Sequence, residues 1–248
     1  MAGFCNYLRV VFSFYEYAKS IDEKLTVIWL ISTQCNGYLL DYFEPIPNIV
    51  FLLEPPENIV IEDIKLNVYE EKPNLIYKGW DPHPLFSPYE YSSLHNGIYI
   101  FKYLKLLPYM NDKIIEKQHI IGNNYISVHI RRTDHIELAK EWSGFTTDND
   151  FIQFIDKFEN TPIYIATDNK ETYNLFKQKY NNRIPFEYHK ELSGWKESET
   201  WEGARHTTLE DAILDIYLCV YSTHFMGSGI SSFSHTINSL RIIHNSST

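Results

Sequence analysis

The chain has 248 residues, of which 44% are hydrophobic and 22% are charged. That composition is ordinary for a soluble globular protein, and the length can bury one large core or two smaller ones. The formal net charge is −10. Such an acidic balance excludes an overall basic field of the kind that holds nucleic acid or an anionic membrane.

The three cysteines predict neither a metal site nor a disulfide framework. Cys5, Cys35 and Cys219 are far apart in the sequence, and no cluster of His, Cys and Asp has metal-ligand spacing. Polar residues interrupt the first twenty positions, and the longest apolar run, residues 25–31, is too short to span a bilayer. We therefore expect a cytoplasmic protein with reduced thiols, no membrane span and no metal.

The sequence pattern of the first half of the chain predicts an irregular α/β domain. Apolar residues at helical spacing predict a helix over 6–19, with a core face of Leu8, Val11, Phe12, Tyr15 and Ala18. Strands are expected at 25–30 and 48–53. Repeated prolines make residues 54–90 a loop, and a helix over 92–107 is expected to end at Pro108. A polar stretch at 111–124 then separates the two halves.

The second half alternates strands with helices. The expected strands are 125–130, 163–167 and 224–226, and the expected helices are 148–158, 170–180, 209–220 and 232–242. This alternation predicts a parallel, doubly wound α/β sheet. Ligands bind at the carboxyl ends of the strands in such sheets.

The most informative segment reads Tyr-Ile-Ser-Val-His-Ile-Arg-Arg-Thr-Asp-His at residues 125–135. Two adjacent arginines at a strand end are costly to desolvate unless an anion meets them. Guanidinium groups bind phosphate through forked pairs of hydrogen bonds. The alternative is a surface ion pair of Arg132 with Asp134 or Glu137.

Three further features follow strands or lie beside the core. Asp168 follows the strand 163–167, where it either lines a site or caps the next helix. Glycines and serines at 227–234 either bind a phosphate or form an ordinary helix cap. Asp215 lies between Leu214 and Ile216, and a half-buried carboxylate needs donors. A guanine ring offers two such donors, whereas the alternative is a structural role, either internal to the helix or as a cap.

Together these motifs resemble the fucosyltransferase superfamily of the α1,6/α1,2/O-fucosyl type, most closely the α1,6-fucosyltransferases. The string His129–Asp134 is similar to the first motif of that family, and the later motifs follow in order. They are Ala166–Asp168, Arg205 with Ile213–Ile216, and Phe225–Ser232. Residues 3–44 resemble the opening of the family, and the likeness is thinnest between residues 54 and 120.

The resemblance implies a fold of the GT-B type, in which two Rossmann-type domains face a cleft and the first is small and irregular. Residues 1–118 are then the acceptor-side domain, and residues 119–248 are the Rossmann-like domain that binds the GDP-sugar. The implied reaction is an inverting, metal-independent transfer of L-fucose from GDP-fucose to a hydroxyl of a glycan. It requires no cofactor besides the donor.

The resemblance also implies roles for individual residues. Arg131 binds the β-phosphate and stabilises the departing GDP, with Arg132 in support. His129 and Asp215 bind the nucleoside, with Asp215 on guanine, while Ser231 or Ser232 contacts the phosphates and Asp168 lines the site. The family motifs place three more residues in the substrate-binding set, namely Asn6, Asp134 and Arg205.

Departures from the family pattern leave the identities of the catalytic base and of the donor sugar undecided. The family's glutamate falls between Glu137, which comes slightly early, and Glu141, which comes late, so we expect Glu137 first and Glu141 next. Asn169 stands where the family has a second aspartate, and Cys5 where it has a glycine. The alternatives are a transferase that uses another GDP-sugar and a catalytically inactive module that binds a GDP-sugar.

Overall fold

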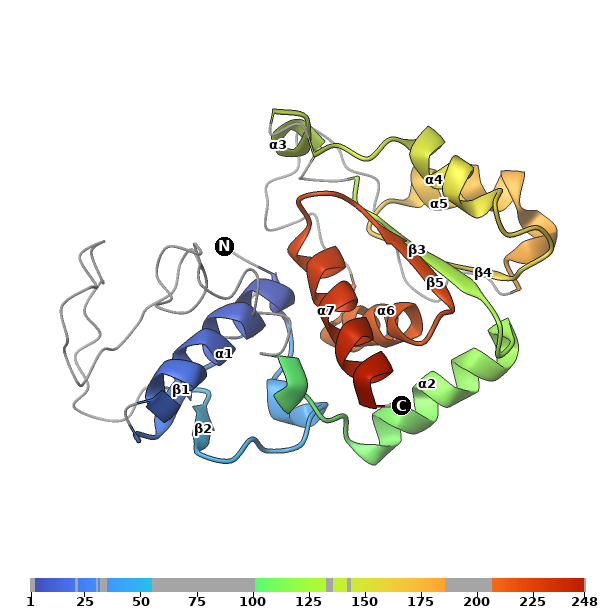
Figure 1. The fold of residues 1–248 in the computed structure, drawn as a ribbon. Helices are drawn as coiled ribbons and strands as arrows, with labels where there is room; N and C mark the ends of the chain where they lie inside the picture. Colours follow the sequence, from blue (N-terminus) through green and yellow to red (C-terminus); the bar gives the residue numbers. More distant parts are fainter. Residues whose placement is uncertain are drawn as a thin grey trace. The chain divides into compact units, whose positions relative to one another are not determined.

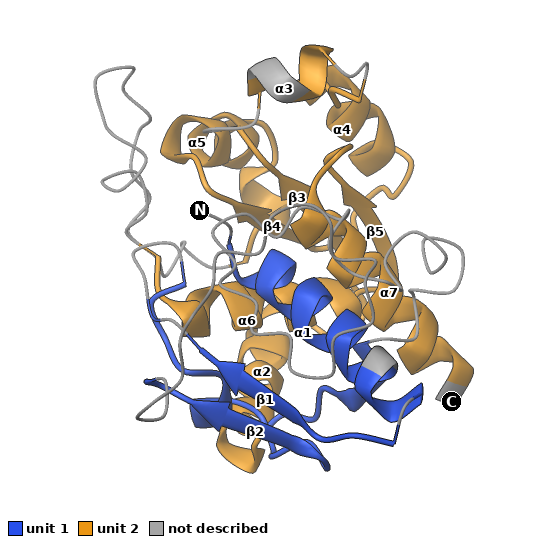
Figure 2. Ribbon diagram, turned by 90° about the vertical axis from the view of Figure 1, so that its left-hand side faces the viewer, with its two compact units in different colours: residues 1–106 blue, residues 107–248 orange. Residues whose placement is uncertain are grey.

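A computed structural model describes residues 3–20, 22–29, 31, 35–54, 101–132, 136–141, 144–185 and 207–247. The chain divides into two compact units, residues 1–106 and 107–248 (Figure 2). The predicted boundary after residue 118 falls inside helix α2 (Pro108–Ile121), which packs against helix α6 (Leu209–Val220) of the second unit. The proline-rich segment 55–90 lies outside the described residues.

In the first unit, helix α1 (Phe4–Ser20) packs against strand β1 (Leu25–Ile28), which pairs in parallel with strand β2 (Ile49–Leu52). The predicted core face of α1 is confirmed, because all five of its apolar residues are buried. Trp29 joins the helix to the strands. Its ring contacts Phe4 and Phe51, and its indole nitrogen donates a hydrogen bond of 2.8 Å to the carbonyl of Gly37.

The prediction that Pro108 ends a helix is wrong. Residues 92–100 of the expected helix lie outside the described residues, residues 101–103 form a 3-10 turn, and Pro108 begins helix α2. Earlier in the first unit, Leu39–Asp41 form another 3-10 turn. Proline is favoured at the first helical position because its missing N–H has no partner within the helix there. The polar stretch after it is therefore helical, and its buried face consists of Met110, Ile114 and Ile121.

The second unit contains a three-stranded sheet in the order β4–β3–β5, with every pair parallel. Its strands are β3 (Ile126–Ile130), β4 (Ile163–Thr167) and β5 (His224–Gly227). Helices α4 (Asp148–Ile155) and α5 (Lys170–Lys179) lie on one side, while α6 and α7 (Ser232–Ser247) lie on the other (Figure 1). The predicted parallel α/β architecture is confirmed here.

Strand β3 separates an apolar face from a polar one. Ile126, Val128 and Ile130 join the core formed with α4 and α5. Residues of the other face make hydrogen bonds towards α6 and α7. These bonds join the Tyr125 hydroxyl to Leu218 O at 2.6 Å, Ser127 Oγ to Ser222 Oγ at 2.7 Å, and His129 Nδ1 to Ser234 Oγ at 2.7 Å. The alternation of side chains along a strand explains this division.

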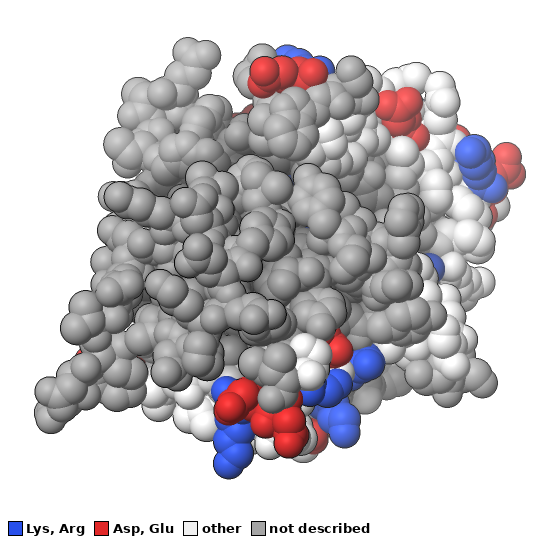
Figure 3. Space-filling model, turned by 60° about the vertical axis from the view of Figure 1, so that its left-hand side comes forward, with Lys and Arg blue, Asp and Glu red and all other residues white. Residues whose placement is uncertain are grey.

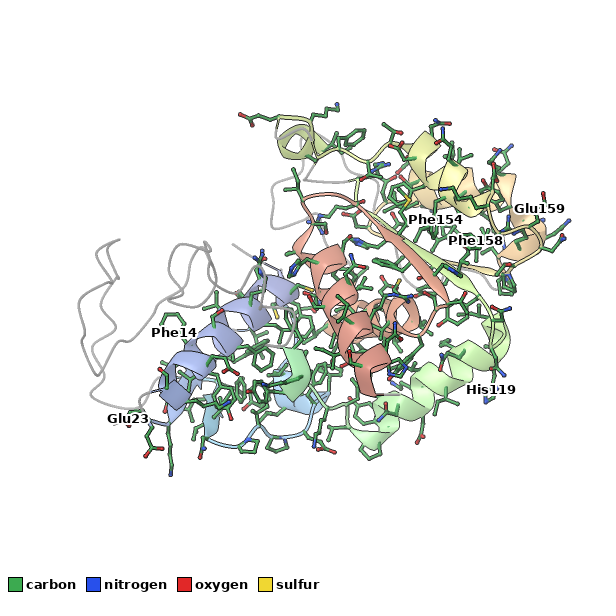
Figure 4. All side chains as sticks on the ribbon, in the orientation of Figure 1. Phe14, Glu23, His119, Phe154, Phe158 and Glu159 are labelled. Atoms are coloured by element: carbon green, nitrogen blue, oxygen red, sulfur yellow. The ribbon has the colours of Figure 1, made fainter. Side chains whose placement is uncertain are left out.

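Two phenylalanines complete the apolar core near the start of β5. Phe154 and Phe158 pack against the core, with their ring centroids 5.3 Å apart (Figure 4). The ring of Phe158 also lies 4.4 Å from that of His224, the first residue of β5. The core therefore extends to the amino end of the sheet, and the carboxyl ends of the strands form a separate polar edge.

The surface of the described residues shows mixed charge. On the face seen in Figure 3, acidic and basic side chains lie next to one another. No helix among the described residues is long and apolar enough to cross a membrane. Nor do these residues include a group of three or more His, Cys, Asp and Glu side chains that could hold a metal ion.

Candidate functional site

The carboxyl ends of the three strands bring together residues from distant parts of the sequence. The backbone N–H of Arg131, after β3, donates a hydrogen bond of 2.9 Å to Ser228 Oγ, after β5. The N–H of Arg132 donates one of 2.9 Å to Asp168 Oδ1, after β4. We call this side of the sheet the carboxyl edge. It is where open α/β sheets bind their ligands.

Arg131 lies at the carboxyl edge beside Asp168. Its Nε is 3.7 Å from Asp168 Oδ2, and the two side chains are 18% and 26% exposed. The pair is partly shielded from water, so its charges interact more strongly than those of a surface pair. Asp168 is not the cap of the next helix, because that role belongs to Asn169, whose side chain accepts from the N–H of Thr172 at 2.8 Å.

Arg132 is directed into the protein and not towards the edge. Its Nη2 lies 2.7 Å from Asp148 Oδ1 and 2.9 Å from the carbonyl oxygen of Thr146, and its Nε lies 3.2 Å from Asp148 Oδ1. The guanidinium also lies over the rings of Phe145 and Phe151. Among the described residues its ion-pair partner is Asp148, whereas Asp134 and the side chain of Glu137, the partners that the alternative expected, lie outside the described set. We therefore expect Arg132 to support Arg131 through the fold and not by sharing its anion.

His129 is held by the first turn of α7. Its side chain is 5% exposed, and its Nδ1 lies 2.7 Å from Ser234 Oγ. Its ring stacks on that of Phe233, with centroids 4.6 Å apart and an interplanar angle of 27°. Gly227, beside it in the sheet, permits this approach, since a Cβ there would lie 2.5 Å from the Ser234 side chain. The imidazole therefore has one fixed orientation beside the carboxyl edge.

The turn between β5 and α7 has a strained backbone. Ile230 has a φ of +56°, which costs a β-branched residue about 1–3 kcal/mol. Ser231 Oγ accepts from the N–H of Ser234 at 3.4 Å, so the predicted capping alternative applies at this helix start. Ser231 is buried, and Ser232 is the first residue of α7. A helix start of this kind also attracts anions.

Asp215 is a buried carboxylate within helix α6. Its side chain is 4% exposed, and the hydroxyl of Tyr164 on β4 donates a hydrogen bond of 2.6 Å to its Oδ1. Of the two structural alternatives, capping is wrong for Asp215, because Thr208 and Asp211 form the capping box of α6. The hydrogen bond from Tyr164 fits the other alternative, a structural role internal to the helix. Tyr164 pairs in register with Ser127, two residues before His129. Along the strand that separation is about 7 Å.

The other predicted residues are placed less completely. Asn6 lies in the first turn of α1, in the first unit. Glu141 is the exposed last residue of helix α3 (Ile136–Glu141). Glu137 lies in the same helix, but its side chain is outside the described set. Asp134 and Arg205 also lie outside the described residues.

Several residues of this region were not predicted as parts of the site. Ser228 lies within the predicted segment 227–234 but was not singled out there, although it follows β5 as Arg131 follows β3 and Asp168 follows β4. Tyr164 and Thr146 act through partners distant in sequence, and no local pattern marks them. Asp148 is the first residue of helix α4 and the ion-pair partner of Arg132. Thr147 caps helix α4 and forms a capping box with Asp150. Hydrogen bonds from Thr147 lower the pKa of Asp150 below its ordinary value.

Comparisons with known proteins identify the family and the fold of the chain. The family model of the GDP-fucose protein O-fucosyltransferases matches residues 95–244. Among curated proteins, none matches this sequence.

Solved structures with the same fold include three of the fucosyltransferase NodZ. The α-1,6-fucosyltransferase NodZ soaked with GDP-fucose has a TM-score of 0.55 and 15% identity, over 96% of this chain and 89% of that one. NodZ co-crystallised with GDP has a TM-score of 0.57 and 16% identity, over 95% of this chain and 88% of that one. NodZ from Bradyrhizobium has a TM-score of 0.56 and 15% identity, over 95% of this chain and 88% of that one. These likenesses establish a mixed α/β fold with parallel sheets.

The family match covers more than half of the chain and includes all three strands of the carboxyl edge. The chain therefore belongs to the GDP-fucose protein O-fucosyltransferase family and is a glycosyltransferase of the fucosyltransferase class.

Proposed function

We propose that this protein transfers L-fucose from GDP-fucose to a hydroxyl of a glycan acceptor, with inversion at the anomeric carbon and without a metal ion. The observation that carries the proposal is the convergence of Arg131, Asp168 and Ser228 at one edge of a parallel sheet. All three lie within the segment that matches the family.

Arg131 is proposed to stabilise the leaving group. Negative charge grows on the β-phosphate as the glycosidic bond breaks, and a cation already fixed near that oxygen favours the transition state. The main chain of Arg131 is fixed by Ser228, and Asp168 holds the Nε side of its guanidinium. The β-phosphate then binds the forked terminal nitrogens.

The nucleoside is proposed to bind on the side of the sheet that faces α6 and α7. His129 and Asp215 both belong to that side. A guanine ring can donate its N1–H and its 2-amino group to the Asp215 carboxylate. Ser231 or Ser232, at the start of α7, is in turn proposed to contact the phosphates.

The whole chain is proposed to form the GT-B arrangement, in which two Rossmann-type domains face a cleft. Residues 119–248 bind the donor, and residues 1–118 form the acceptor side. The parallel pairing of β1 with β2 supports a Rossmann-type first domain. Asn6, Asp134 and Arg205 complete the proposed substrate-binding set.

The acceptor has two candidate classes. A glycan hydroxyl is the first, and the fold shared with an α-1,6-fucosyltransferase supports it. A serine or threonine hydroxyl of a protein is the second, because the matched family is that of the GDP-fucose protein O-fucosyltransferases. Competition between a soluble oligosaccharide and a folded protein acceptor for radiolabelled fucose distinguishes the two.

The donor is tested by incubating the purified chain with GDP-fucose or GDP-mannose and measuring the release of GDP, with and without EDTA. We expect faster release from GDP-fucose and no loss on chelation. Faster release from GDP-mannose would identify a transferase for another GDP-sugar. GDP binding without turnover of either donor would identify an inactive module. Loss on chelation that manganese restores would contradict the metal-independent mechanism.

Replacing Arg131 with alanine should lower transfer by about 100-fold or more, because a charge-assisted contact to the leaving phosphate is lost. Arg131→Lys should recover only part of the rate, since an ammonium cannot form the fork. Arg183→Ala is the matched control, because Arg183 bonds the carbonyls of Phe158 and Thr161 near the start of β4. Initial rates with GDP-fucose, alongside melting curves, provide the measurement. Normal transfer by folded Arg131→Ala would refute the donor-site assignment.

Asp215→Asn should weaken GDP binding by at least about tenfold, because a hydrogen bond to a charged group contributes roughly 1.5–3 kcal/mol. The amide oxygen of the variant still accepts from Tyr164, so the helix keeps its contact with β4. Binding of inorganic pyrophosphate should be spared. Isothermal calorimetry with both ligands measures this difference.

Tyr164→Phe is the matched control for Asp215→Asn. It removes the donor and leaves the carboxylate, which should cost about 1–3 kcal/mol of the free energy of unfolding while GDP affinity stays near normal. Unchanged GDP affinity in Asp215→Asn would show that the Asp215–Tyr164 hydrogen bond is purely structural.

The base is proposed to be Glu137, with Glu141 as the second candidate. A carboxylate must lie within hydrogen-bond reach of the acceptor hydroxyl as it attacks the anomeric carbon. Glu137→Gln should leave GDP binding near normal and lower transfer by about 10²–10⁴-fold, the usual contribution of a positioned base. The same assay on Glu141→Gln decides between the two. Full activity in both variants would place the base elsewhere, in the first unit.

A further inference from the structure

The segment Gly144–Asp148, which precedes and opens helix α4, contacts two of the three turns of the carboxyl edge. Thr146 makes both contacts. Its Oγ1 accepts a hydrogen bond of 2.9 Å from the N–H of Gly229, in the turn after β5. Its carbonyl oxygen accepts one of 2.9 Å from Arg132 Nη2, in the turn after β3.

On the β3 side, Arg132 ties this segment to the residue proposed to bind phosphate. Asp148 Oδ1 lies 2.7 Å from Arg132 Nη2 and 3.2 Å from Nε, and Arg132 Nη1 donates to the carbonyl oxygen of Arg131 at 3.1 Å. One guanidinium thus connects Asp148, Thr146 and the backbone of Arg131. Because Arg132 is only 9% exposed, water competes little for its bonds to the two carbonyl oxygens, whereas the Asp148 side chain is 47% exposed and its ion pair is screened more.

On the β5 side, the contact is close enough to require glycine. A Cβ on Gly229 would clash with the carbonyl oxygen of Gly144, and a Cβ on Gly144 would clash with the side chain of Ile230. Ile230 holds a φ of +56° in this contact. The segment and the turn therefore fit together in one relative position, and a hydrogen bond to Thr146 fixes it.

We propose that Gly144–Asp148 is a clasp that sets the distance between Arg131 and the turn after β5, and that Thr146 and Asp148 are positioning residues for the pyrophosphate of the donor. The inference rests on the proposed function. Phosphate oxygens bound by both turns need them at a fixed separation, and a displacement of about 1 Å in such a site costs on the order of 100-fold in rate. Neither Thr146 nor Asp148 has to touch the donor for this effect.

The test compares the same substitution at neighbouring residues. Thr146→Val removes the acceptor for Gly229 with little change in shape, whereas Thr147→Val removes the helix cap of α4. We expect Thr146→Val to weaken GDP binding by about tenfold, which is the size of effect that one lost hydrogen bond gives, and Thr146→Ser to restore it. Thr147→Val should lower the melting temperature while GDP affinity stays near that of the wild type. Calorimetry with GDP and melting curves give the two readouts.

A second pair tests the β3 side. Asp148→Ala removes the partner of Arg132, and Asp150→Ala removes a carboxylate of the same helical turn that contacts Thr147. Both variants lose one negative charge at the start of α4, so they share the helix-dipole effect. We expect Asp148→Ala alone to raise KM for GDP-fucose and lower kcat.

The outcomes separate the clasp from the proposed function. Wild-type protein that binds no GDP would overturn the proposed function and the clasp with it. Wild-type binding with unchanged GDP affinity in folded Thr146→Val would overturn the clasp and leave the proposed function standing. Equal losses of affinity in Thr146→Val and Thr147→Val would also overturn it, because a general loosening of α4 then accounts for the effect.

Discussion

The candidate donor contacts of the second unit depend on β3 having a parallel partner on each side. Parallel pairing with β4 and β5 puts the carboxyl ends of all three strands at one edge. Arg131, Asp168 and Ser228 are separated by tens of residues in the sequence, yet backbone and side-chain hydrogen bonds join their turns directly. If one strand were antiparallel, its following turn would lie at the opposite edge and the cluster could not form.

A second constraint comes from the polar groups buried between the sheet and helices α6 and α7. Each buried donor or acceptor left without a partner costs about 1–3 kcal/mol, so the helices must sit where the partners meet. Arg241 of α7 contributes strongly here, because its guanidinium donates to the carbonyls of Cys219, Val220 and Ser222 at the end of α6. This capping fixes α7 against α6, and α7 in turn carries Phe233 and Ser234, which orient His129.

The sequence predicted the features that depend on local periodicity and on strand ends. The buried face of α1, the parallel α/β order of the second unit and the position of Arg131 after β3 all follow from such patterns. Sequence reasoning failed where a residue's role depends on its partner in space. A proline can be the first residue of a helix or the residue that follows a helix. The buried face of α2 makes Pro108 the first residue. Tyr164 becomes the partner of Asp215 only because β4 lies under α6.

The two adjacent arginines show why the binding partner of each one cannot be inferred from the Arg-Arg sequence alone. Alternation along β3 points residues 126, 128 and 130 towards α4 and α5, and Arg132 continues that row to reach Asp148 and Phe151 of α4. Arg131 continues the other row, with Ser127 and His129. Side chains of neighbouring residues in an extended backbone point to opposite faces. The pair therefore combines one arginine that anchors the turn in the protein, Arg132, with one that lies at the carboxyl edge, Arg131, and the two cannot exchange positions without a change of register in β3.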